Sequence, residues 1–111
     1  MTPTQYQRLQ KQIQQKRDEA IAAASAICNE VKTAPTEEDL QQRETALQVA
    51  QLWITADRSG ARALREAIKR YEEKTYQYDS PRKAKARKQA AAIVRADLLK
   101  MESQENITPA Q

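Results

Sequence analysis

Apolar residues recur every three or four positions along most of the chain, which is the spacing of one face of an α-helix. The most apolar stretch is residues 46–56 (ALQVAQLWITA), where apolar side chains fall on nearly every side of a helix. This pattern is typical of a helix that is buried on several faces. We therefore expect residues 40–78 to form the centre of an all-α fold, with amphipathic helices packed against it.

The first predicted helix covers residues 3–33. Thr2 and Pro3 have the residue types of an N-cap and a first helical position, and the residue before Pro35 avoids helical angles. The second half of this helix, residues 20–28 (AIAAASAIC), is broader and more apolar than the first half. We expect the second half to pack more tightly.

The number of helices depends on residues 57–60 (DRSG). The three–four spacing runs unbroken from Leu40 to Tyr78, which favours one long helix. Against this, Gly60 is the only glycine of the chain and follows an aspartate and a serine, residues typical of helix caps. We predict a break, and so an antiparallel four-helix bundle with helices at residues 3–33, 37–57, 60–78 and 81–102. The alternative is three helices, with one long central helix over residues 37–78. In either case residues 1–102 form a single helical domain, and residues 103–111 are predicted to be a disordered tail.

The composition excludes most chemistry. The chain of 111 residues contains no histidine, one cysteine and one glycine. It therefore lacks the commonest base, a set of cysteine zinc ligands and a glycine-rich phosphate loop. The acids at residues 37–39 are explained as first-turn residues behind the cap Thr36, where the helix dipole favours them. We expect no enzymatic activity, no cofactor, no metal and no small-molecule substrate.

The sequence predicts a cytoplasmic protein. Cys28 is the only cysteine, so no internal disulfide can form, which favours a reducing compartment. The longest apolar run is too short to span a bilayer. The polar N-terminus lacks the basic-then-apolar order of a secretion signal, and we expect no membrane contact.

Positive charge is concentrated in one segment. The formal net charge is only +4, but residues 80–96 carry six cations and no acid. These cations are Arg82, Lys83, Lys85, Arg87, Lys88 and Arg95. Five of them lie in the first two turns of the last predicted helix, where they oppose the helix dipole and point all round the axis. We expect this end of the helix to stand clear of the core. Phosphate groups bound there would neutralise the charge of the cationic side chains and interact favourably with the helix N-terminus.

Two neighbouring features fit a nucleic-acid partner. Tyr76 and Tyr78 lie just before the basic segment, where aromatic rings can stack on unpaired bases. Residues 80–83 (SPRK) resemble the short Ser-Pro-basic-basic elements of proteins that track the DNA minor groove.

A helix-turn-helix that reads DNA is a further alternative over residues 48–68. Arg58, Arg62 and Arg65 would face outward on its second helix. Ile54 and Thr55, however, stand where its turn normally has a glycine and an apolar residue.

Two functional hypotheses follow. The first is a non-enzymatic accessory subunit of a larger assembly that contacts the phosphates of DNA or RNA through the basic helix start, largely independently of sequence. The alternative is a protein–protein adaptor or homo-oligomer. Its partner would meet the apolar seam of the first helix (Tyr6, Leu9 and Ile13) or Trp53.

Overall fold

The computed structural model describes residues 2–30, 33–73 and 80–105. Within these residues the chain forms three α-helices and no strand: α1 (Pro3–Asn29), α2 (Glu37–Glu73) and α3 (Pro81–Glu105). The all-α class is confirmed. The four-helix bundle is not confirmed, and the three-helix alternative matches the number of helices. None of the helices in this part of the chain is long and apolar enough to cross a lipid bilayer.

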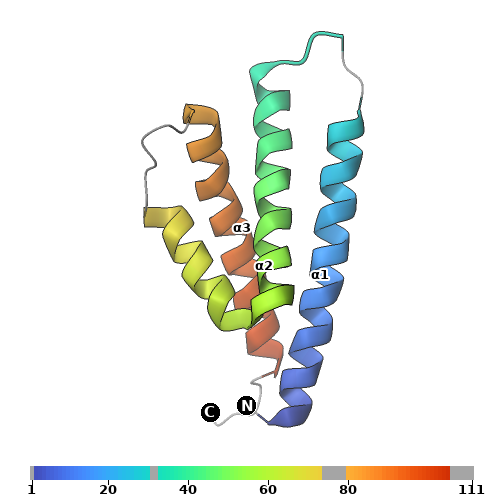
Figure 1. Ribbon diagram of the computed structural model, residues 1–111, viewed down its shortest axis with the longest axis vertical. Helices are drawn as coiled ribbons and strands as arrows, with labels where there is room; N and C mark the ends of the chain where they lie inside the picture. Colours follow the sequence, from blue (N-terminus) through green and yellow to red (C-terminus); the bar gives the residue numbers. More distant parts are fainter. Residues whose placement is uncertain (1, 31–32, 74–79, 106–111) are drawn as a thin grey trace.

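α2 is bent at Gly60, where the backbone has φ 92° and ψ 172°. Only glycine adopts this combination at low cost. The bend divides α2 into a first arm, residues 37–59, and a second arm, residues 61–73, which turns back toward the start of α3 (Figure 1). The predicted break at residues 57–60 is therefore present as a bend inside one element, even though the apolar spacing continues through it.

Polar contacts show that α1 and the first arm are antiparallel. Arg17 Nη1 donates to Asp57 Oδ2 over 2.6 Å, which joins the middle of α1 to the end of the first arm. Arg43 Nη2 donates to the carbonyl oxygen of Glu30 over 3.1 Å, which joins the start of the first arm to the end of α1.

Four contacts set the direction of α3. The start of α3 meets the start of the first arm, whereas its end meets the start of the second arm. The pairs are Arg82–Glu37, Gln89–Thr45, Arg95–Glu72 and Arg65–Glu102. α3 is therefore parallel to the first arm of α2 and antiparallel to the second.

The helix starts follow the sequence prediction. Thr2 and Gln5 form a reciprocal capping box before α1. Thr36 and Asp39 do the same before α2, with N···O distances of 2.8 and 3.1 Å. Asp39 is thus a capping residue, as the first-turn acids suggested.

The helix ends differ from the prediction by a few residues. α1 ends at Asn29 rather than at residue 33, because the backbone of Glu30 is already extended. α3 continues through Glu105, so residues 103–105 of the predicted disordered tail are helical. The rest of that tail, residues 106–111, lies outside the described residues.

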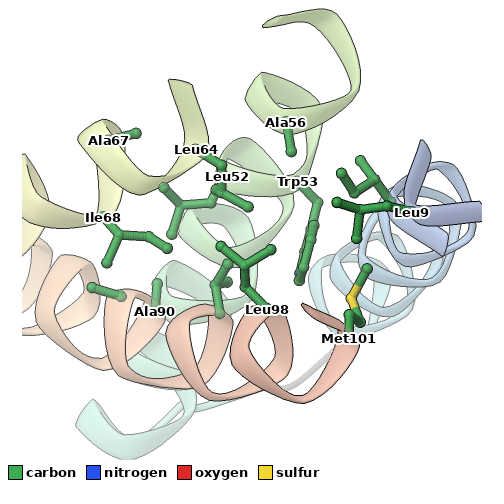
Figure 2. Packing of buried hydrophobic residues seen from close by; sticks show 13 residues of the cluster. Leu9, Leu52, Trp53, Ala56, Leu64, Ala67, Ile68, Ala90, Leu98 and Met101 are labelled. Atoms are coloured by element: carbon green, nitrogen blue, oxygen red, sulfur yellow. The ribbon is translucent and has the colours of Figure 1, made fainter. Parts of the chain in front are cut away.

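The core gathers around Trp53, which is only 1% exposed. Figure 2 shows its ring pointing into the space between side chains of α1 and α3. The other large members of this cluster are Leu9, Ile13, Leu52, Leu64, Ile68, Val94, Leu98 and Met101. They come from the first half of α1, both arms of α2 near the bend and the second half of α3, so the core occupies one end of the molecule.

The packing of α1 is the reverse of our prediction. Leu9 and Ile13, in the first half, are fully buried, whereas Ala24 is the only buried residue of the apolar stretch 20–28. Figure 1 shows the reason: α1 and α3 lie on opposite sides of α2 at the upper end of the view, where the second half of α1 is. Among the described residues, the more apolar half of α1 therefore packs mainly against α2.

We predict that Gly60→Ala destabilises the protein by about 1–3 kcal/mol, the cost of holding an L-residue in this backbone conformation. A Cβ atom at residue 60 would meet no atom within 4 Å, so the loss should come from the backbone alone. Urea unfolding followed by the fluorescence of Trp53 measures this difference. The control Ser59→Ala, at an exposed neighbour, should change stability by less than about 0.5 kcal/mol. A Gly60→Ala protein as stable as the control would mean that the bend does not depend on glycine.

Candidate functional site

The basic start of α3 is built on a side-chain cap. Ser80 Oγ accepts a hydrogen bond from the backbone N–H of Lys83 over 3.1 Å, and the Ser80 carbonyl accepts one from Ala84. Pro81 occupies the first helical position. Residues 80–83, which resemble a DNA-tracking element, therefore have a sufficient structural role as a helix start.

Arg82 is already paired within the chain. Its Nε and Nη2 atoms donate to the two carboxylate oxygens of Glu37 over 2.8 Å each. The Arg82 carbonyl also accepts a hydrogen bond from Gln41 over 3.1 Å. The bidentate contact raises the pKa of Arg82 and lowers the pKa of Glu37, because each charge stabilises the other. This cation is therefore largely neutralised.

The other two arginines of the basic segment are engaged as well. Arg95 Nε donates to Glu72 over 2.9 Å, and this contact raises the pKa of Arg95. It lies about 20 Å along the helix axis from Arg82, so it does not belong to the same surface. Arg87 also interacts with another group of the chain.

Three lysines of the basic segment have no ion-pair partner in the part of the chain that the structure describes. Within residues 2–30, 33–73 and 80–105, Lys83, Lys85 and Lys88 form no ion pair. Lys85 shares a groove with Glu37 and Glu38, so acids of α2 lie beside this positive surface. The basic segment is therefore a smaller and more mixed charge patch than the sequence indicated.

The expectation that this end of α3 stands clear of the core is wrong. Ala86 and Ala90 are fully buried, and Gln89 Oε1 accepts a hydrogen bond from the hydroxyl of Thr45 over 2.9 Å. Ala86, Ala90, Val94 and Leu98 recur every four residues and form one buried stripe. Ala86 extends this stripe into the segment that carries the cations.

The aromatic candidates Tyr76 and Tyr78 lie outside the described residues. The helix-turn-helix alternative stays a prediction. Arg58, Arg62 and Arg65 are exposed, as it requires, although Arg65 forms an ion pair with Glu102.

Three of the four residues predicted to form a partner interface are not available for it. Leu9, Ile13 and Trp53 are at most 3% exposed and belong to the core of the chain itself. Only Tyr6, which is 56% exposed, remains available at the surface. Figure 2 shows Leu9 beside Trp53 of α2 and Met101 of α3, so the chain itself covers this seam.

A large open hollow lies where α1 and α3 separate. It is a groove of about 830 Å³ over the first arm of α2. Its apolar lining consists of Ala20, Ala23 and Ile27 from α1, Ala46 and Val49 from α2, and Ile93 from α3. Its polar lining consists of Glu37, Glu38, Gln41, Gln42, Thr45, Lys85 and Gln89. Sequence reasoning did not identify this site, since its residues come from three helices whose separation only the fold decides.

Among the described residues, no three Asp, Glu or Cys side chains come close enough together to hold a metal ion. Comparison of the chain with protein families, with curated proteins and with solved structures finds no match. Function is therefore inferred from the geometry of this chain alone.

The Arg82–Glu37 pair predicts a measurable titration. Arg82 lowers the pKa of Glu37 in the folded protein, so the pair stabilises the fold at pH values above the pKa that Glu37 has in the unfolded chain. This stabilisation is lost as the pH falls through the lower pKa that Glu37 has in the folded protein. In Arg82→Ala the pKa of Glu37 should rise toward its ordinary value, as followed by NMR of the carboxyl carbon. Lys85→Ala removes a nearby cation that does not bind Glu37 and serves as the control. Identical Glu37 titrations in wild type and Arg82→Ala would show that the pair does not form in solution.

Proposed function

We propose that this protein is a non-enzymatic interaction module that binds an amphipathic helix of another protein in the groove between α1 and α3. The observation that carries this proposal is the exposed apolar lining of the groove. Ile93 is 48% exposed, and Ala23 is exposed on the opposite wall. Exposed apolar surface gathered in a hollow with a polar rim is typical of protein-binding sites.

The dimensions of the groove fit a helix. Its floor runs along α2 from Glu38 to Val49, a rise of about 17 Å or roughly three helical turns. The alanines of its walls permit the close axial distances of about 8–10 Å found between packed helices. A helix in this position would lie between α1 and α3 and complete a bundle at the end of the molecule that lacks the second arm of α2.

The rim supplies charge for orientation. Glu38 lies at the α2 side and Lys85 at the α3 side, and neither forms an ion pair with another described residue. A partner with a cation opposite Glu38 and an acid opposite Lys85 would dock in one direction, because the reverse direction would juxtapose like charges. The absence of histidine from the chain and its single cysteine support a binding role rather than a catalytic one.

The test uses two substitutions on α3 that make the same chemical change. Ile93→Glu places a charge in the groove, whereas Leu99→Glu places one on the same helix outside it. Both side chains are about half exposed, so neither variant should unfold. In quantitative affinity capture from cell extract, wild type and Leu99→Glu should retain the same proteins. The Ile93→Glu protein should retain at least about tenfold less of them. Identical capture by wild type and Ile93→Glu would contradict the groove as the binding site.

A second candidate function is contact with nucleic-acid phosphates through Lys83, Lys85 and Lys88. These three lysines have no ion pair among the described residues. The pairing of Arg82 and the position of Arg95 reduce the number of phosphates that this surface can neutralise. We therefore rank this function below helix binding.

If nucleic acid binds here, three phosphate contacts should give a log–log salt slope of about −2.7 on duplex DNA, at about 0.9 per contact. Fluorescence anisotropy with a labelled duplex measures this slope. Lys85→Glu should weaken binding, whereas the matched change Lys100→Glu near the other end of α3 should weaken it less. No binding at low salt, or equal losses in both variants, would remove this candidate.

A further inference from the structure

A second apolar surface lies on the other flank of α1. It is a shallow hollow of about 360 Å³ between α1 and the first arm of α2, and it shares no residue with the groove. We call it the α1–α2 patch. Its main apolar residues are Ile21, Ala24, Cys28, Leu47, Ala50 and Ile54. Two of them are large and exposed: Ile21 by 40% and Leu47 by 46%.

The α1–α2 patch carries no charge. Although 31% of the chain is charged, none of the described residues that line this hollow is Lys, Arg, Asp or Glu. A charged partner surface would lose hydration against it without gaining an ion pair. The surface that matches it best is therefore also apolar and uncharged. The groove differs in this respect, because acids and a lysine line its rim.

We propose that the α1–α2 patch is the interface of a two-fold symmetric homodimer in which α1 packs antiparallel against α1 of a second copy. A two-fold contact brings the same patch of both copies together, so the uncharged surface of one copy packs against the identical uncharged surface of the other. The patch residues of α1 run from Ile21 to Asn29, which places the two-fold axis near Ser25. Ile21 of one copy then lies against Cys28 and Asn29 of the other.

Small side chains make this contact possible. Ala24, Ser25 and Ala50 leave room for the two α1 helices to approach closely, while Ile21 and Leu47 supply the apolar area. Nine residues line the patch in each copy, against about 20–30 residues a side in an interface of standard size. The dimer is therefore weak, with a dissociation constant roughly in the micromolar to millimolar range.

The symmetry has a consequence for binding. The groove lies on the other flank of α1, so each copy of the dimer keeps its groove open. If the groove binds a helix as proposed above, the dimer presents two such sites and binds a partner carrying two helices with avidity. The dimer itself does not depend on the function of the groove.

Sedimentation equilibrium from about 10 μM to about 1 mM protein tests the dimer. Wild type should associate reversibly, and Ile21→Glu and Leu47→Glu should each raise the dissociation constant at least about tenfold. Ile93→Glu, the groove variant, should dimerise like wild type, so failure of the dimer and failure of the groove are distinguishable. Circular dichroism confirms that the variants are folded. A wild-type monomer throughout this range, or a dimer that neither patch variant weakens, overturns the proposal.

Cysteine crosslinking tests the antiparallel arrangement. With Cys28 changed to Ser, Ser25→Cys should form an interchain disulfide on mild oxidation, because the two Cα atoms lie close to the two-fold axis. Ala26→Cys in the same background is the control, since residue 26 points about 100° further round α1. Crosslinking of the control as readily as Ser25→Cys overturns the placement of the axis.

Discussion

The conformation of Gly60 is the constraint on which the rest of the fold depends. As a straight helix, α2 would be a rod of about 55 Å with its apolar residues spread along its length. The bend brings Leu64 and Ile68 of the second arm to the same cluster as Trp53 of the first. Because φ is 92° at this position, an L-residue would oppose the bend that gathers the core.

The bend also explains why the surface is uneven. It places the second arm at one end of the molecule, where it covers α3 and the core around Trp53 closes. At the other end α1 and α3 lie on opposite sides of α2, and no fourth described segment lies between them (Figure 1). The apolar residues 20–28 of α1 therefore line a groove on one flank and a hollow on the other, instead of entering the core. Both proposed interfaces lie here, because no further described helix covers this half of α1.

Ion pairs between helices account for much of the charge that first indicated a polyanionic partner. Glu37 holds Arg82 and Glu72 holds Arg95, each through both carboxylate oxygens. Both pairs are solvent-exposed, so their net contribution to stability is small. Their effect on function is larger, because a cation bound to a carboxylate is a poor ligand for phosphate. What remains is a short row of lysines beside the acids of α2.

Several features were determined by the sequence alone because they are local. Helical class, the caps at Thr2 and Thr36, and the break near Gly60 each depend on residues within a few positions of one another. The apolar stretch around Trp53 indicated that its side chain is buried, but not whether the core of this chain or a partner covers it. Tertiary structure alone decided which half of α1 is buried, which cations find carboxylates 23 or 45 residues away, and where a groove opens. Periodicity states which face of a helix is apolar but not which other helix covers it. Which helix covers that face depends on the direction in which the chain leaves the bend. At Gly60 the backbone conformation sets this direction, and the spacing of apolar residues does not encode it.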